Sequence, residues 1–130
     1  MSMIGPEIAS STAPPSLGGL IKISSSDVLK TVPKGVTPPL SYLKFLENVG
    51  YGTVQSGIFT IYSGLVEPKD VFGIDDQKLD GILLFGDDLS GYLYGFSVIN
   101  WRIVEVDQHR DVISMGDVSF EEFLNRKIAS

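Results

Sequence analysis

The stretch GDDLSG comes closest to a catalytic or metal-binding set: Asp87, Asp88 and Ser90 lie there between Gly86 and Gly91. Neighbouring carboxylates can share a proton or hold a divalent cation. A calcium loop, however, needs oxygen ligands at alternate positions and a distal glutamate, which this stretch lacks. Successive residues of an extended segment also point apart, so the doublet alone does not converge on one atom. Because Gly, Asp and Ser favour tight connections between strands, we predict a turn here.

Two other stretches resemble nucleotide-handling motifs. GYGTVQSG, at 50–57, has the glycine content of a phosphate loop, and HRD, at 109–111, matches the start of a kinase catalytic loop. A kinase also needs an asparagine five residues after that aspartate, where this chain has Gly116, and a lysine on the strand after the glycines. A dinucleotide fingerprint follows a strand, whereas these glycines follow a predicted helix. We interpret both matches as chance.

His109 is the only histidine and the chain has no cysteine. These counts exclude a two-histidine metal site, a thiolate zinc site and a cysteine nucleophile. As a general base, His109 would need an orienting acid and a nucleophile. Asp107 and Asp111 flank it, but its polar neighbours predict an exposed hairpin turn. We therefore predict no catalytic residue, no metal ligand and no cofactor, and hence no enzyme; a small hydrolase that uses the aspartates is the least favoured alternative.

The predicted elements begin after a lead-in, 1–20, that is rich in Ser, Pro, Gly and Ala and is expected to be irregular. A short helix follows, capped by one of three serines and stopped by Pro33. A longer helix is predicted to start at Thr37 as its cap, with two prolines in its first turn. The serines are Ser24, Ser25 and Ser26; the prolines are Pro38 and Pro39; the apolar stripe of the longer helix is Leu40, Leu43, Phe45, Leu46 and Val49.

Strands are predicted at 57–62, 82–85, 92–96 and 101–106 from β-branched and aromatic content. The residues 82–85 are apolar on both faces, as expected of a covered central strand. A final helix is predicted from the cap Ser119 and from Glu122 three residues later. Its buried face comprises Phe120, Phe123, Leu124 and Ile128.

This order of elements predicts an α+β fold: one domain over 21–130, with a mainly antiparallel sheet flanked by a helix on its N-terminal side and by a C-terminal helix. The 130 residues fit one domain. No basic start followed by an apolar run indicates a signal peptide, and no apolar stretch is long enough to cross a membrane. We expect a cytoplasmic protein that does not bind membranes.

Charge is unevenly distributed along the chain. The net charge is −6, and most of the 16 acidic residues lie between Glu67 and Glu122. An acidic half repels phosphate backbones, which argues against direct binding of nucleic acid. It attracts a basic protein partner. On charge alone, we favour the simpler interpretation of an acidic surface that only keeps the protein soluble.

Four stretches, in order, resemble one family. They are PPLSYLKFLENVGYG, GIFTIY, GILLFGDDLSGYLYGF and SFEEFLNRKI. Their order over 37–128 is similar to that of the SUKH superfamily, the Smi/Knr-type proteins. The resemblance implies a non-enzymatic α+β domain. This sequence departs from the family in two places. The turn GDDLSG has fewer glycines than usual, and the usual glutamate-rich helix is missing before Thr37.

The resemblance also implies a function in protein binding. Bacterial members mostly serve as immunity proteins that bind and neutralise a polymorphic toxin, often a nuclease, and fungal members regulate cell-wall assembly. We expect an immunity protein whose acidic segment binds a basic toxin domain, with a regulatory scaffold as the alternative. The candidate contacts are the carboxylates Asp75, Asp76, Asp87 and Asp88, with Tyr92, Tyr94 and Trp101 as aromatic anchors. Aromatic residues can anchor a partner, but the simpler interpretation of these three, which we favour, is a core or half-buried place in the sheet.

Overall fold

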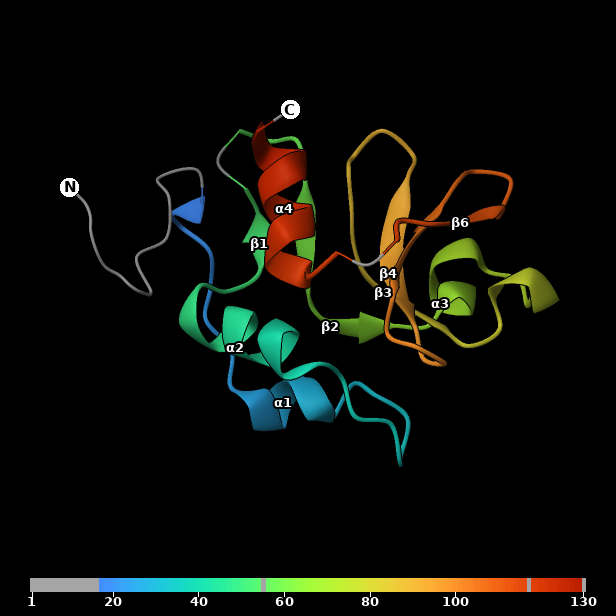
Figure 1. Ribbon diagram of the computed structural model, residues 1–130, viewed down its shortest axis with the longest axis horizontal. Helices are drawn as coiled ribbons and strands as arrows, with labels where there is room; N and C mark the ends of the chain where they lie inside the picture. Colours follow the sequence, from blue (N-terminus) through green and yellow to red (C-terminus); the bar gives the residue numbers. More distant parts are fainter. Residues whose placement is uncertain (1–16, 55, 117, 130) are drawn as a thin grey trace.

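The computed structural model describes residues 17–54, 56–116 and 118–129 (Figure 1). Of the predicted irregular lead-in, residues 1–16 lie outside the described residues. Within the described part, six strands form one sheet in chain order, each antiparallel to the next. The strands are β1 (Gly52–Thr53), β2 (Thr60–Val66), β3 (Ile82–Asp87), β4 (Leu93–Ser97), β5 (Ile103–Val106) and β6 (Val112–Ser114).

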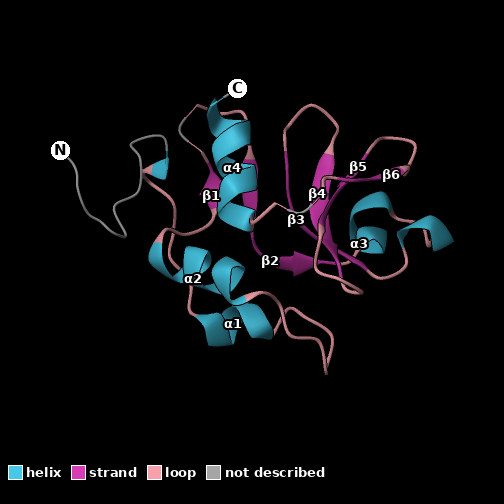
Figure 2. Cartoon of the chain, viewed as in Figure 1, coloured by secondary structure: helices cyan, strands magenta, loops and turns pink. Residues whose placement is uncertain are grey.

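The helical segments flank this sheet (Figure 2). They are α1 (Ser25–Leu29), α2 (Leu40–Asn48), α3 (Pro68–Phe72), the 3₁₀ turn η2 (Gln77–Leu79) and α4 (Phe120–Ala129). An antiparallel sheet with helices before and after it confirms the predicted α+β fold.

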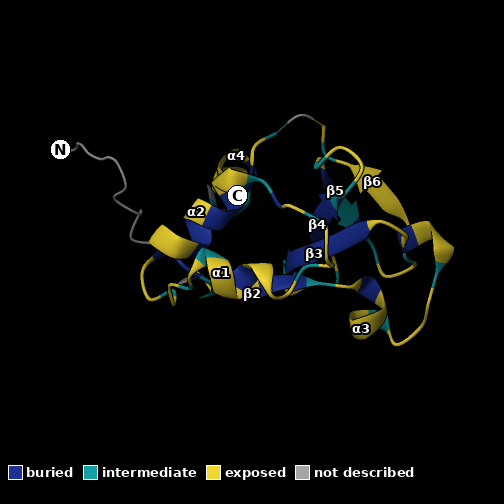
Figure 3. Cartoon of the chain, turned by 90° about the horizontal axis from the view of Figure 1, so that it is seen from below, coloured by how far each residue is buried: buried dark blue, intermediate teal, exposed yellow. Residues whose placement is uncertain are grey.

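Strand β3 lies in the middle of the sheet and has buried apolar side chains on both faces. Leu83 and Phe85 point into the larger core, which α1, α2 and α4 cover. Ile82 and Leu84 point to the other face, where Leu79 of η2 packs over them. The predicted central strand is therefore confirmed, and each face has its own covering layer. Figure 3 shows β3 and β4 as buried strands between these layers.

Aromatic rings form the centre of the larger core. The ring of Phe85 lies 5.0 Å, centroid to centroid, from Phe96 of β4 and from Phe120 of α4. The ring of Tyr42 of α2 meets Phe96 and Phe120 edge-on at 5.4 and 5.1 Å. Edge-to-face pairs of this kind add to the stabilisation that area burial gives. The core thus joins both long helices to the middle of the sheet.

The predicted serine caps of the first and last helices are confirmed. The hydroxyl of Ser24 accepts the amide N–H of Asp27 at 3.2 Å and begins α1. The hydroxyl of Ser119 accepts the amide N–H of Glu122 at 3.1 Å and begins α4. Both are local bonds between residues three positions apart, which is why the sequence indicates them.

The start of α2 was predicted too early. Pro39 is the N-cap, and no side chain caps the helix, so Thr37 does not serve as its cap. A residue before proline is kept out of the helical region, and this excludes Pro38 from the helix. Leu40, predicted to be buried, begins the helix and is 63% exposed, while Tyr42 is buried in its place.

Strand boundaries also differ from the prediction. The strand expected at 57–62 is β2, which begins at Thr60 and extends to Val66, because Gly57 has a φ of 74° and lies in a turn. The short edge strands β1 and β6 were not predicted. Neither has the alternation or length that a sequence pattern needs.

Gly95 allows close contact between β4 and β3. A Cβ atom there would lie 2.4 Å from the carbonyl oxygen of Leu83, on backbone that cannot move aside cheaply. We expect Gly95→Ala to lower the free energy of unfolding by about 1–3 kcal/mol, as overpacking in a core does. Urea denaturation followed by circular dichroism measures this change. Ser63→Ala, at an exposed position of β2, is the control and should change stability by less than about 0.5 kcal/mol.

Tyr42 is fully buried, and its hydroxyl has no hydrogen-bond partner among the described residues. Burial raises the pKa of this phenol. Because an unpaired buried hydroxyl is costly, Tyr42→Phe should leave stability unchanged or raise it by about 1–2 kcal/mol. The matched control is Tyr94→Phe, which removes a hydroxyl bonded to Glu105 and Lys127 and should lower stability. Equal losses in both variants, measured by urea denaturation, would contradict this assignment.

Candidate functional site

The acidic doublet closes the connection between β3 and β4. Oδ1 of Asp88 accepts the amide N–H groups of Ser90 and Tyr92 at 2.9 and 3.1 Å. Oδ2 of Asp87 accepts the hydroxyl of Tyr62 at 2.7 Å. Burial, and secondarily Asp87, raises the pKa of Tyr62. The predicted turn is confirmed, and both carboxylates are engaged in holding it.

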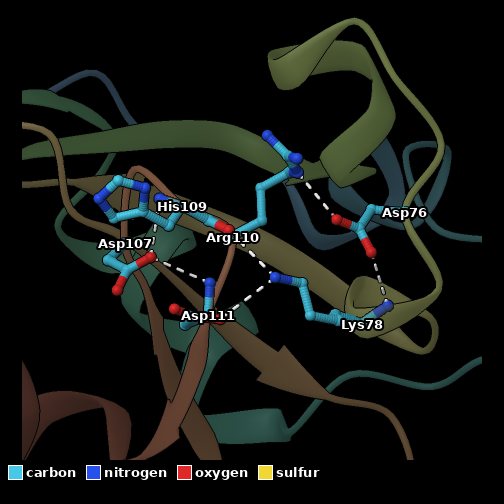
Figure 4. A network of polar contacts seen from close by, with 6 residues as sticks. All are labelled: Asp76, Lys78, Asp107, His109, Arg110 and Asp111. Carbon is cyan, nitrogen blue, oxygen red and sulfur yellow. Dashed lines mark hydrogen bonds and ion pairs between the residues drawn. The ribbon is translucent and has the colours of Figure 1, made fainter.

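His109 lies exposed in the turn between β5 and β6, as predicted (Figure 4). Oδ1 of Asp107 accepts the amide N–H groups of His109 and Asp111 at 2.8 and 2.9 Å. These bonds, with that from Asp111 the largest contributor, lower the pKa of Asp107. Asp107 therefore organises the backbone of this turn, and the HRD residues form a hairpin connection.

The same turn is bound to the segment that covers the smaller core (Figure 4). Nε of Arg110 donates to Oδ2 of Asp76 at 2.8 Å, and both side chains are largely shielded from solvent. Nζ of Lys78 donates to Asp111 Oδ1 and to the carbonyl oxygen of His109, each at 3.1 Å. The Arg110 guanidinium holds the pKa of Asp76 below its ordinary value of 3.8. Asp76 is thus paired within the chain.

The three aromatic candidates occupy different environments. Tyr92 is 42% exposed, and Trp101 is half-buried against the ring of Phe96. Tyr94 is 1% exposed. Its hydroxyl donates to Glu105 and accepts from the Lys127 ammonium at 2.8 and 2.7 Å. The prediction that Tyr94 anchors a partner is therefore not compatible with its position, because its ring packs in the core against Phe59 and Phe123.

A pocket of about 190 Å³ lies where α3 and the segment that follows it meet the start of β3. We call it the acidic pocket. Its apolar wall includes Val36, Ile74, Leu79, Ile82 and Val98. Its charged residues are Glu67, Lys69, Asp75, Asp76 and Asp80. Four acidic residues and one lysine thus line a concave, partly apolar surface.

The structure brings only part of the predicted set together. Asp75 and Asp76 line the acidic pocket beside Ile82, at the start of β3. Asp87 and Asp88 lie at the opposite end of β3, away from the pocket. Within the described ranges, no group of three or more His, Cys, Asp or Glu side chains could hold a metal ion. In the same residues, no helix has the length and hydropathy to cross a membrane.

Sequence reasoning missed Glu67 and Asp80 as members of this site. Both lie in the acidic half of the chain, so their charge was the only signal that the sequence offered. What the sequence could not show is that the loop at Val36, more than thirty residues earlier, forms a wall of the same pocket. Pro33 and Val36 of the α1–α2 connection line the pocket together with Pro68 and Lys69 of α3.

Comparison with known proteins gives one family. A family model described as "SUKH_6: SMI1-KNR4 cell-wall" matches residues 34–124. No curated protein and no solved structure gives a significant match. The matched range contains all six strands, α2 and every charged residue of the acidic pocket.

The lowered pKa values of Asp76 and Asp107 have a consequence for stability. A carboxyl whose pKa is lower in the folded state stabilises the fold above its unfolded pKa, and this contribution is lost as the pH falls through its folded pKa. We expect stability to fall as the pH drops below about 3.8. Arg110→Gln should weaken this pH dependence, because Asp76 loses the charge that lowers its pKa.

Thermal unfolding between pH 2 and pH 6 measures this effect. The control is Lys44→Gln, which removes one positive charge at an exposed position of α2. The control should keep the acid dependence of the unchanged protein. An identical profile for Arg110→Gln would show that Asp76 does not contribute.

Proposed function

Because the chain belongs to the SUKH_6 family of SMI1-KNR4 cell-wall proteins, we propose that it is a protein-binding module. More specifically, we propose an immunity protein that binds and neutralises a toxin domain with a basic surface, in the cytoplasm. The observation that carries this proposal is the acidic pocket, whose carboxylates exceed its cations by four to one. Charge complementarity of this kind gives specificity and accelerates association.

The carboxylates of the pocket differ in what they already bind. Asp76 is paired with Arg110, and Glu67 lies 3.8 Å from Lys69 at an exposed position. The side chains of Asp75 and Asp80 are exposed and form no ion pair or hydrogen bond with the described residues. These two charges are therefore available to a partner without breaking a contact of the fold.

Neutralisation would follow from where such carboxylates bind. A nuclease holds its substrate through basic residues that contact phosphates. An immunity protein that sets carboxylates against those residues takes the place of the phosphates and blocks the substrate. The negative potential of the whole acidic half attracts a basic partner and accelerates association. Salt screens this attraction, so association slows as salt is added.

The proposal includes the absence of catalysis by this chain. In the described residues, the acidic doublet and Asp107 accept backbone N–H groups, and Asp76 accepts a guanidinium. Groups engaged in this way hold turns in place. A regulatory scaffold is the second candidate, favoured by the description of the matched family as cell-wall proteins. A toxin gene next to the gene for this protein favours immunity, and its absence favours the scaffold.

Where a gene next to this one encodes a large secreted protein, co-expression with its C-terminal domain, as the candidate toxin domain, tests the proposal. We expect the cells to survive, the two proteins to co-purify, and the complex to weaken by at least about tenfold as salt rises from 50 to 200 mM, since screened charge pairs supply the steering. Cells that die, with no complex recovered at low salt, would rule out the immunity role. A complex that is insensitive to salt would keep the binding role and reject the electrostatic mechanism.

A further inference from the structure

We propose that the acidic pocket receives a single lysine or arginine side chain from the partner protein. The inference rests on the proposed protein-binding function and names the contact by which it occurs. It commits to a cationic side chain with an aliphatic stem, because the pocket combines an apolar wall with carboxylates.

The size of the pocket limits what it can hold. Small-molecule and cofactor sites commonly measure roughly 300–1,000 Å³. At about 190 Å³, the acidic pocket is smaller than these. Its volume suits one long side chain inserted from a surface that covers the opening.

The wall of the pocket matches the stem of such a side chain. Val36, Ile74 and Val98 come from three separate segments and give the pocket an apolar surface. Lysine and arginine bury their methylene groups along apolar surface while the charged head stays with polar groups. An acidic side chain would be repelled, and a purely apolar one would leave the carboxylates without a partner.

The charges of the pocket match the head of such a side chain. Asp75 and Asp80 both line the pocket and are exposed and unpaired within the described residues, so a cation that reaches either carboxylate gains charge-assisted hydrogen bonds. The chain itself shows this chemistry at the adjacent carboxylate, where the Arg110 guanidinium binds Asp76 at 2.8 Å. A partner arginine would make the same kind of contact with Asp75, the neighbour of Asp76 in the chain.

The pocket is held in shape before any partner arrives. Oδ1 of Asp76 accepts the amide N–H of Lys78 at 3.0 Å and caps η2. The amide N–H of Val98 donates to the carbonyl oxygen of Gly81 at 2.8 Å and fixes the wall beside Asp80. Preorganisation lowers the entropy cost of binding, which makes one inserted side chain an effective anchor.

Titration of the ¹⁵N-labelled protein with N-acetyl-arginine amide and N-acetyl-lysine amide tests the pocket directly. We expect weak binding, with amide shift changes concentrated at 67–69, 74–81 and Val98. N-acetyl-norleucine amide has an apolar side chain without a charge and should bind more weakly by about tenfold, since it lacks the charge-assisted bonds. Shift changes that avoid these residues, or equal binding of the three probes, would overturn the inference.

Two double variants separate the pocket from the general acidic field. Asp75→Asn with Asp80→Asn should weaken binding of the arginine probe by about tenfold. Asp70→Asn with Glu121→Gln removes the same charge at exposed residues outside the pocket and should change it by less than about twofold. Equal loss in both variants would assign the effect to the field and reject the pocket. The spectrum of each free variant shows whether it is folded.

The same variants, tested with the toxin domain, distinguish failure of the pocket from failure of the proposed function. Loss of affinity confined to the Asp75/Asp80 variant supports the pocket. Equal affinity of that variant and the unchanged protein rejects the pocket and leaves the binding function standing. If the unchanged protein does not bind the toxin domain, the immunity role is rejected, and the probe titration alone decides the pocket.

Discussion

The two-sided burial of β3 is the constraint on which the rest of the structure depends. A strand with apolar side chains on both faces needs two covering layers, and helices from both ends of the sequence form the larger one. The other covering layer comes from the short segment between β2 and β3, which contributes the buried side chain of Leu79. Burial of Leu79 therefore holds its acidic neighbours Asp75, Asp76 and Asp80 near the start of β3. The position of the acidic pocket is thus a consequence of how the centre of the sheet is buried.

The carboxylates of the acidic half divide into two groups by what they contact. Asp88 and Asp107 accept backbone N–H groups and shape hairpin turns, and Asp76 joins the covering segment to Arg110. Asp75 and Asp80 have no such task within the described residues. A high acidic content therefore overstates the charge that is free to act on a partner. The distinction matters for any variant, because neutralising the first group changes the fold as well as the potential.

Contacts between residues close together in the chain could be predicted from the sequence, whereas the packing of distant segments could not. Ser24 and Ser119 cap helices through bonds that span three residues, and the GDDLSG turn follows from its own residue types. Tyr94 and Tyr92 have the same strand parity, yet one is buried and the other exposed, because α4 covers only the first. The edge strand β6 is three exposed residues whose extended form depends on its pairing with β5. No residue pattern encodes the meeting of Val36 with Asp80 across the pocket.

The strict chain-order pairing of the strands bears on how the protein folds. Each strand pairs with its neighbours along the chain, so most of the meander can assemble one connection at a time with short loop closures; the connection between β2 and β3, which carries α3 and η2, is longer. The aromatic core cannot be completed in that way, since Phe120, on the last helix α4, packs against Phe85 and Tyr42. During synthesis, the face that holds the larger core would be covered only in part, by α1 and α2, until α4 leaves the ribosome. Docking of that helix is then the late step that converts a set of hairpins into a protected native state.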